Sequence, residues 1–325
     1  MPGHSTEDRI YVAGHRGLVG STLCRSLEKR GYENLITISH DELDLRNADG
    51  LRRFLRETRP HMAYLCAAKV GGIIANFSQP AEFITDNLKI QTAFIDECYQ
   101  AGVHEMLFVG SGCIYPRESP QPIREEYLHT GPLEFTNRPY ALAKLAGIEM
   151  CWAHNRQYGT RYAVALPTNM YGPGDNYDLE NGHVVAGLIR RFHEAKMAEA
   201  PAISLWGTGR PRRELMYSED AADACVTVME HVLGEDGDFF NDTKAPIFNV
   251  GINGPDTQVS DLAHLVRSVV GYTGDIQWDH SRPDGTPKKQ LESTLLRQLE
   301  WRPSMDLEEG LRRTYDAYRA TLDNP

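Results

Sequence analysis

Two side chains able to exchange protons stand four positions apart in the segment Tyr140-Ala-Leu-Ala-Lys144, and Ser111 follows an apolar run that ends at Val109. On a helix this spacing puts the phenol and the ammonium on one face. A free phenol has a pKa of about 10, and a nearby ammonium is expected to lower that pKa toward neutrality. With Ser111 hydrogen-bonding a carbonyl, the pattern predicts acid–base catalysis at that carbonyl. A helix with a packed tyrosine and a surface lysine is the alternative.

Three glycines recur at every third position in Gly14-His-Arg-Gly17-Leu-Val-Gly20, where an apolar run ends and a helical pattern begins. Glycine here permits a tight turn, close backbone approach to a ligand and close helix–strand contact. The free N–H groups and the positive dipole end of the helix then suit a pyrophosphate. The segment predicts dinucleotide binding, and a turn without a ligand is the alternative.

Strand-like and helical segments alternate over the first 170 residues, which predicts an α/β fold with a Rossmann-type, doubly wound parallel sheet. In this scheme the glycine segment follows the first strand and Ser111 follows the fourth. We expect strands at Ile10–Ala13, Leu35–Ile38, Met62–Ala67, Met106–Val109 and Tyr162–Leu166, and helices over 18–30, 48–57, 81–101 and 140–158.

The alternation loosens after Pro167, and residues 168–182 are expected to form a loop. We predict a dinucleotide-binding domain over 1–175 and a smaller mixed α/β lobe, mainly for substrate, over 176–325, with some later elements free to return to the first sheet. The later helices are expected over 183–197, 220–233 and 259–270 and twice near the C-terminus, and strands near Ile203–Trp206, Ile247–Val250 and Ile276–Trp278.

Composition narrows the class of protein. The 325 residues hold 34 Lys+Arg and 45 Asp+Glu, a formal net charge of −11, which argues against a nucleic-acid partner. Met1–Arg9 lacks the apolar stretch of a signal peptide, and no apolar run is long enough to span a membrane. The six cysteines are scattered, without a CxxC pair. This pattern predicts reduced thiols in a cytoplasmic protein with no metal site.

Seven segments together carry a family resemblance: Gly14-His-Arg-Gly-Leu-Val-Gly20, Ala67-Ala-Lys-Val-Gly-Gly72, Gly110-Ser-Gly-Cys-Ile-Tyr-Pro116, Pro139-Tyr-Ala-Leu-Ala-Lys144, Pro167-Thr-Asn-Met-Tyr-Gly-Pro173, Arg190-Arg-Phe-His-Glu-Ala195 and Pro283-Asp-Gly-Thr-Pro-Lys288. Over nearly its whole length the chain resembles the extended short-chain dehydrogenase/reductase family, and within it the epimerase/reductases of GDP-4-keto-6-deoxy sugars.

The resemblance implies a bifunctional enzyme that converts GDP-4-keto-6-deoxy-D-mannose to GDP-L-fucose. Cys113 and His183 match the pair that inverts C-3 and C-5, and Ser111, Tyr140 and Lys144 match the group that assists hydride transfer from NADPH to C-4. A thiol beside a cation and an imidazole both titrate near neutrality, as repeated proton exchange on carbon requires. Without the family motifs, a packing role for Cys113 and His183 is the alternative.

The resemblance also implies the binding residues. The cofactor is expected to be NADP, held by Gly14, His15, Arg16, Gly17, Leu18, Val19, Gly20, His40, Asp44, Leu45, Ala67, Lys144, Pro167, Asn169 and His183. The GDP-sugar is expected to meet Arg191, Trp206, Arg213 and Asp284, where surface ion pairs or core packing are the alternatives.

Two segments depart from the family pattern. The end of the second strand carries Ile38, Ser39 and His40 in place of an arginine, with no acidic residue for a ribose hydroxyl, which leaves Arg16 for the 2′-phosphate of NADP. The segment Tyr217-Ser-Glu-Asp220 also differs from the His-Val-Asp-Asp sequence that commonly follows the substrate-binding arginine in the family.

Two other functions stay open. One is a related GDP-keto-sugar enzyme with a different sugar, such as a keto-heptose or a dideoxy sugar, or with a single inversion. The other is a non-catalytic NADP-binding regulator, against which the intact Ser111, Tyr140 and Lys144 argue. The resemblance further implies a homodimer that pairs the helices near 81–101 and 140–158.

Overall fold

Six parallel strands form the central sheet of the computed structural model, which describes residues 4–179, 182–232, 239–240, 243–281, 284 and 286–323. The strand order is β10-β5-β4-β3-β1-β2. Their bounds are β1 Ile10–Ala13, β2 Leu35–Ile36, β3 Met62–Leu65, β4 Glu105–Val109, β5 Arg161–Pro167 and β10 Ile247–Val250. The predicted doubly wound, Rossmann-type sheet is confirmed.

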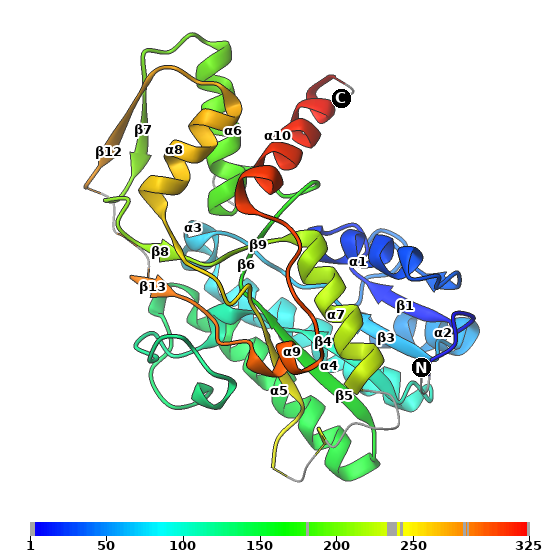
Figure 1. Cartoon of the computed structure of the whole chain (residues 1–325). Helices are drawn as coiled ribbons and strands as arrows, with labels where there is room; N and C mark the ends of the chain where they lie inside the picture. Colours follow the sequence, from blue (N-terminus) through cyan, green and yellow to red (C-terminus); the bar gives the residue numbers. More distant parts are fainter. Residues whose placement is uncertain are drawn as a thin grey trace.

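Helices cover both faces of this sheet (Figure 1). The helices α2 (Ala48–Thr58), α4 (Pro80–Gln100) and α5 (Arg138–Tyr158) pack on one face, and α1 (Leu18–Lys29) and α7 (Ser218–Val232) pack on the other. Side chains of a strand point alternately to its two faces. Accordingly Tyr11 packs under the first set of helices, while Ile10 and Val12 pack under the second. Both faces are apolar because both are covered.

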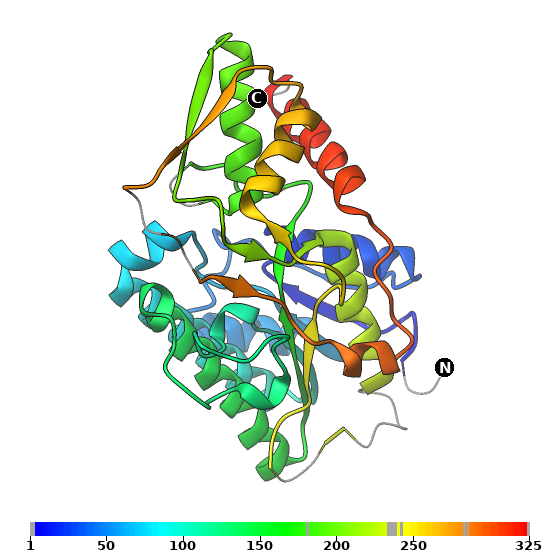
Figure 2. The same cartoon turned by 60° about the vertical axis from the view of Figure 1, so that its left-hand side comes forward.

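A smaller lobe stands above the carboxyl edge of the sheet (Figures 1 and 2). It consists of α6 (Val184–Met197), α8 (Val259–Val270) and α10 (Leu307–Asp323) with the parallel pair β7 (Ala202–Trp206) and β12 (Asp275–Asp279). These elements bury an apolar core of their own.

Short strands join the lobe to the sheet layer. They are β6 (Asn169–Tyr171) paired with β9 (Leu215–Tyr217), and β8 (Arg212–Arg213) between β11 (Thr257–Gln258) and β13 (Lys288–Lys289). The remaining helices are α3 (Ile73–Ser78) and α9 (Thr294–Gln298), with 3₁₀ turns η1 (Gly112–Ile114), η2 (Glu125–Tyr127) and η3 (Phe135–Asn137).

Several predicted bounds need correction. The second and third strands end earlier than expected, at Ile36 and Leu65, and α3 was not predicted. The segment expected to be wholly loop contains β6, which exists because β9 pairs with it from a distant part of the chain. Both β10 and α7 follow residue 175 in the chain; β10 is the edge strand of the central sheet and α7 covers that sheet, so they are later elements of the kind that the sequence analysis left free to return to it.

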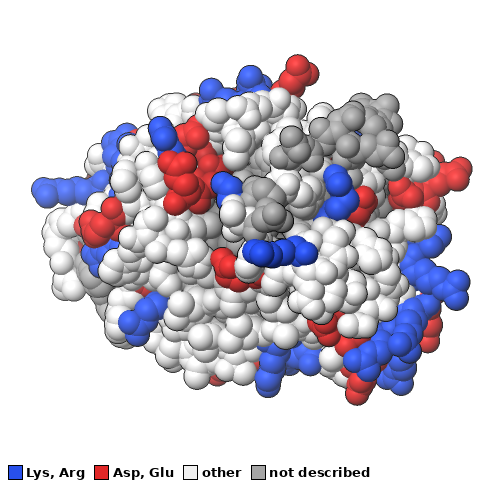
Figure 3. All heavy atoms as spheres, turned by 90° about the horizontal axis from the view of Figure 1, so that it is seen from below, with Lys and Arg blue, Asp and Glu red and all other residues white. Residues whose placement is uncertain are grey.

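The face seen from below carries both signs of charge side by side, with large uncharged areas between the charged groups (Figure 3). Among the described residues, no helix combines the length and the apolar character that crossing a membrane requires.

Candidate functional site

The glycine turn lies where the chain reverses direction across the sheet. β1 is flanked by β2 on one side and β3 on the other, and ligands of open α/β sheets bind at the carboxyl ends of strands at such a switch point. Gly14 adopts a φ of 87°, and a Cβ on it would lie 2.7 Å from the amide nitrogen of Ala67. Only glycine fits this left-handed position against the end of β3.

The N-terminus of α1 can receive an anion. Its first residues follow Gly17, which supplies no side-chain cap, and its first turn holds no acidic residue. The N–H groups there and the positive dipole end favour a negatively charged ligand. In the same turn Nδ1 of His15 is buried without a hydrogen-bond partner in the structure. The turn that contains Leu18 and Val19 therefore fits a dinucleotide.

The turn that follows β2 brings Glu42 against Ser39. Glu42 accepts hydrogen bonds from the amide (3.1 Å) and hydroxyl (2.6 Å) of Ser39. The Ser39 bonds, with smaller contributions from Arg16 and His15, lower the pKa of the Glu42 carboxyl. A carboxylate from outside the segment 38–40 therefore lies beside Ser39. Local folding of residues 39–42 brings it there.

Two of the other residues expected at the cofactor lie just beyond that turn. Arg46 holds the Asp44 carboxylate with its Nε (3.0 Å) and Nη2 (2.7 Å), and Leu45 is buried in the core on that face of the sheet. His40, in contrast, is exposed.

Ser111 and the helix α5 bring together the predicted proton-transfer group. The backbone of Ser111 is extended, and its hydroxyl accepts a hydrogen bond from the amide of Cys113 at 3.2 Å. The same side chain lowers the pKa of the Tyr140 phenol. One turn along α5, Lys144 donates to the carbonyl of Val109 at 2.8 Å. The ammonium also lies 4.6 Å from the centre of the Phe108 ring.

The prediction that the pKa of Tyr140 is lowered is wrong. Burial raises the pKa of this phenol, and a charge on Cys113 raises it further, while the hydrogen bond to Ser111 lowers it. Lys144 is almost wholly buried, which lowers the pKa of its ammonium to about 8. Desolvation disfavours both charged forms. Tyr140 is therefore a neutral phenol at pH 7 and can donate a proton.

Cys113 and His183 lie close enough for the charge of each to affect the other. His183 precedes α6, and its Nδ1 is 3.7 Å from Oδ1 of the buried Asp175. The pairing with Asp175 raises the pKa of the imidazole, despite opposition from burial, so the charged form is favoured. The second oxygen of Asp175 is buried with no hydrogen-bond partner in the structure. Sequence analysis missed Asp175.

One cation of the junction strands lies beside the thiol, and a second interacts with it through charge. Nζ of Lys289 is 3.2 Å from Sγ of Cys113, and a charge on Cys113 acts on Arg213. Burial lowers the pKa of Arg213, whose Nη1 donates to the carbonyls of Arg212 (2.8 Å) and Thr286 (2.7 Å). No sequence signal indicated Lys289, because its place depends on the pairing of β13 with β8.

Residues expected at the GDP-sugar occur in two contacts of the lobe. The guanidinium of Arg191 lies 5.3 Å from the ring centre of Trp206, a favourable cation–π arrangement. Asp284 accepts from the amide (2.9 Å) and hydroxyl (2.6 Å) of Thr208, and its charge reaches Arg213. Pro283 and Gly285 of the same predicted motif lie outside the described residues.

The buried carboxylate of Glu214 connects separate segments of the chain near the junction strands. Glu214 accepts hydrogen bonds from the amides of Ile252 (2.8 Å) and Leu291 (2.9 Å). The side-chain amide Nδ2 of Asn169 donates to the backbone carbonyl of Glu214 at 3.5 Å. The carbonyl of Pro167, at the end of β5, lies beside Gly112. Pro167 and Asn169, which were predicted to bind the cofactor, thus lie at the carboxyl edge of the sheet.

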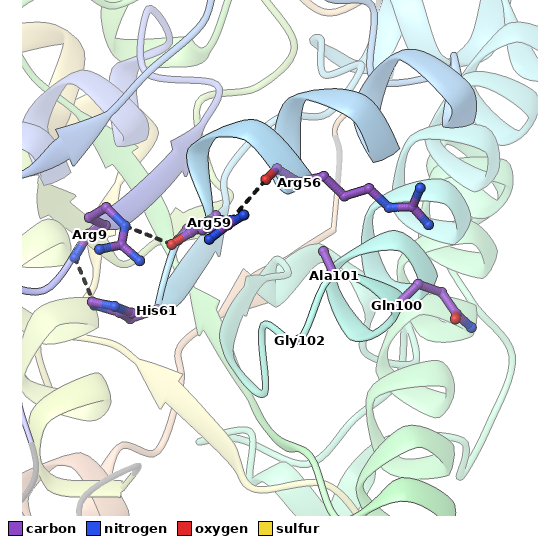
Figure 4. A pocket seen from close by; sticks show the side chains of 8 residues that line it. Arg9, Arg56, Arg59, His61, Gln100, Ala101 and Gly102 are labelled. Carbon is purple, nitrogen blue, oxygen red and sulfur yellow. Dashed lines mark hydrogen bonds between the residues drawn. The ribbon is translucent and has the colours of Figure 1, made fainter.

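A hollow of about 470 Å³ lies at the opposite edge of the sheet, among Arg9, Arg56, Arg59 and His61 (Figure 4). Arg9 donates to the carbonyl of Arg59 at 2.8 Å, and the Arg56 side chain extends away from Arg9 and His61 (Figure 4). The C-terminal ends of α2 and α4 border the hollow and disfavour an anion there. It is separate from the site described above.

Comparison with known proteins gives full-length similarities. Residues 10–251 match the NAD dependent epimerase/dehydratase family. The GDP-L-fucose synthase of Sinorhizobium fredii is 46% identical over 310 residues, covering 95% of each chain. A GDP-6-OMe-4-keto-L-xylo-heptose reductase from C. jejuni superimposes with a TM-score of 0.91 at 32% identity, covering 98% of this chain and 99% of the other. A gdp-l-fucose synthetase from Naegleria fowleri bound to NADP gives a TM-score of 0.87 at 25% identity, covering 99% and 98%.

Proposed function

Since the chain belongs to the NAD dependent epimerase/dehydratase family, we propose that it converts GDP-4-keto-6-deoxy-D-mannose to GDP-L-fucose with NADPH. One observation carries the proposal: the Ser111 hydroxyl accepts a hydrogen bond from the amide of Cys113, and both the Ser111 side chain and a charge on Cys113 act on the pKa of Tyr140. The proton donor suited to reduction at C-4 and the thiol suited to inversion at C-3 and C-5 therefore lie near each other around one serine. The 46% identity to the S. fredii enzyme supports this substrate.

Inversion uses Cys113 and His183. The C-4 ketone acidifies the hydrogens at C-3 and C-5. The Cys113 thiolate removes one of these protons, and the electrons of the C–H bond move to the C-4 oxygen as an enediolate forms. The His183 imidazolium, stabilised by Asp175, returns a proton to the opposite face of the same carbon. Both groups then exchange protons with water, and the second carbon is inverted in the same way.

Reduction uses Tyr140. NADPH bound at the glycine turn would supply a hydride to C-4; the phenol donates its proton to the C-4 oxygen, which Ser111 holds by a hydrogen bond. Burial keeps Tyr140 protonated until that step. The Lys144 ammonium, held beneath the site by the carbonyl of Val109, stabilises the phenolate that results.

The glycine turn and α1 bind the pyrophosphate of NADPH, and His15 offers its partnerless ring nitrogen there. Arg16 would meet the 2′-phosphate, and Asp44 and Leu45 would be further contacts of the cofactor. The remaining cofactor contacts are His40, Ala67, Lys144, Pro167, Asn169 and His183. On the substrate, Arg191 and Arg213 neutralise the GDP phosphates, while Trp206 and Asp284 contact the nucleotide.

The experiment is to supply GDP-4-keto-6-deoxy-D-mannose and NADPH in deuterated water, and to follow both absorbance and product labelling. The parent enzyme should oxidise NADPH and release GDP-L-fucose with deuterium at C-3 and C-5. Cys113→Ser should incorporate much less deuterium and release 6-deoxy sugars that keep an original configuration, whereas Cys24→Ser, a change on α1, should behave as the parent. No NADPH oxidation with this substrate would refute the proposal.

The enzyme acts as a homodimer through α4 and α5, which pack together on one face of the sheet. On α5, Leu142 is 46% and Tyr158 43% exposed, which supports a contact with a second chain. Leu142→Glu should give a monomer in size-exclusion chromatography with light scattering. The matched change Leu322→Glu, at an equally exposed leucine of α10, should leave the dimer intact.

Reduction of a related GDP-keto-heptose is the second candidate, favoured by the TM-score of 0.91 to the C. jejuni heptose reductase. Competition between the two keto sugars for NADPH oxidation decides between them. A higher kcat/KM for the heptose would favour the second candidate.

A further inference from the structure

Lys289 makes a direct hydrogen bond to the thiol of Cys113, from a point 176 residues further along the chain, with Nζ 3.2 Å from Sγ. Its backbone is held independently of its side chain: β13 pairs with β8, so that Lys289 lies opposite Arg213, and the amide of Glu214 donates to the carbonyl of Lys289 at 3.2 Å. A change of the Lys289 side chain therefore leaves the strand pairing in place.

Charged and titratable groups from several other elements surround the thiol, and the pocket that Cys113 lines also holds Arg117, Glu134 and Lys288. Arg213 lies on β8 but directs its Nη1 to two carbonyls. His183 lies before α6 and is bound to Asp175, and Tyr140 lies on α5 as a neutral phenol. Among the described residues, Lys289 is thus the cationic side chain that hydrogen-bonds the sulfur of Cys113.

We propose that Lys289 is a positioning residue that holds Cys113 as a thiolate before substrate binds. Its use as a base rests on the proposed function, whereas the thiolate itself needs no substrate. During inversion the sulfur takes a proton from C-3 or C-5 and becomes a thiol, and the electron pair moves to the C-4 oxygen. Lys289 keeps its own proton throughout. The thiol then releases its proton to water, because Lys289 again favours the charged sulfur, and the second inversion begins from the same state.

The balance of charges agrees with this geometry. Burial raises the pKa of the Cys113 thiol, but Lys289 and the Ser111 side chain lower it more, with a smaller contribution from His183. Buried thiols elsewhere in the chain show the opposite result: burial raises the pKa of Cys225 to about 12. The difference is the adjacent ammonium.

Alkylation of Cys113 by iodoacetamide tests the proposal without substrate, since only the thiolate reacts. The rate is followed from pH 5 to 10 by mass spectrometry of the Cys113 peptide. In Lys289→Met the midpoint should move to higher pH, and the rate at pH 7 should fall at least about tenfold, the effect of one pKa unit. Lys289→Arg should retain most of the rate. Lys288→Met, whose lysine pairs with Asp256 at 3.0 Å, should match the parent.

Thermal unfolding and NADPH binding, unchanged in Lys289→Met, establish that the variant is folded. An alkylation profile identical to that of the parent would then overturn the proposal, whatever the enzyme's substrate is. If the profile shifts, deuterium incorporation at C-3 and C-5 should also fall and recover as the pH is raised, while hydride transfer to an already inverted substrate is spared. Loss of hydride transfer together with inversion would show that Lys289 acts on substrate binding and would overturn the proposal.

Discussion

Replacement of Gly20 by alanine tests whether the backbone of the glycine turn forms the cofactor site. A Cβ on Gly20 would lie 2.2 Å from the carbonyl oxygen of Gly14 and 2.9 Å from Cα of His15. Both atoms belong to backbone, so the turn itself must move. Overpacking of this kind costs about 1–3 kcal/mol of the free energy of unfolding. Displaced N–H groups should also weaken NADPH, since one charge-assisted hydrogen bond contributes about 1.5–3 kcal/mol.

Gly17→Ala provides the matched control. A Cβ there would lie 3.4 Å from the Gly14 oxygen, an ordinary contact, so we expect the free energy of unfolding to change by less than about 0.5 kcal/mol. NADPH binding should still weaken, because this Cβ stands where the pyrophosphate approaches the start of α1. Urea unfolding gives the stability and calorimetric titration gives the Kd for NADPH. If Gly20→Ala kept the parent's stability and its Kd for NADPH, the argument would be refuted.

Three further predictions concern the chemistry. Tyr140→Phe should lower reduction by about 100- to 10,000-fold, as loss of one general acid does, while the Kd for NADPH stays the same; near-parental turnover would contradict the assignment. Arg16→Ala should weaken NADPH by about 1.5–3 kcal/mol more than NADH, measured as two dissociation constants, and equal losses would mean that Arg16 has only a structural role. Because burial lowers the pKa of Lys144 to about 8, its ammonium is present below that pH and lost above it. The reduction rate of an already inverted substrate should therefore fall as pH rises through about 8. If that rate stayed unchanged up to pH 10, a role for this charge would be excluded.

Local patterns in the sequence determined the framework of the molecule. Alternating apolar runs and amphipathic stretches are short-range signals. They located the central-sheet strands β1 to β5, and they predicted the helix α8 over 259–270, where the structure has Val259–Val270. Glycine spacing likewise indicated the turn at Gly14, since a φ of 87° is a local requirement that only glycine meets easily.

The junction strands and α3 escaped the same analysis, because strands of two or three residues and a single six-residue helix carry too little periodicity to identify. β6 becomes a strand only through β9, and β13 only through β8. The stability of such pairs depends on contacts between distant parts of the chain.

Tertiary structure alone decided the electrostatic surroundings of the reactive groups. Tyr140 and Lys144 were found by their spacing, yet the phenol pKa is raised where a lowered value was expected, because burial depends on all surrounding elements. Cys113 was found by resemblance, but the ammonium beside it comes from Lys289, 176 residues away. Charge interactions depend on distance in space and on desolvation, and neither quantity is encoded in the order of neighbouring residues.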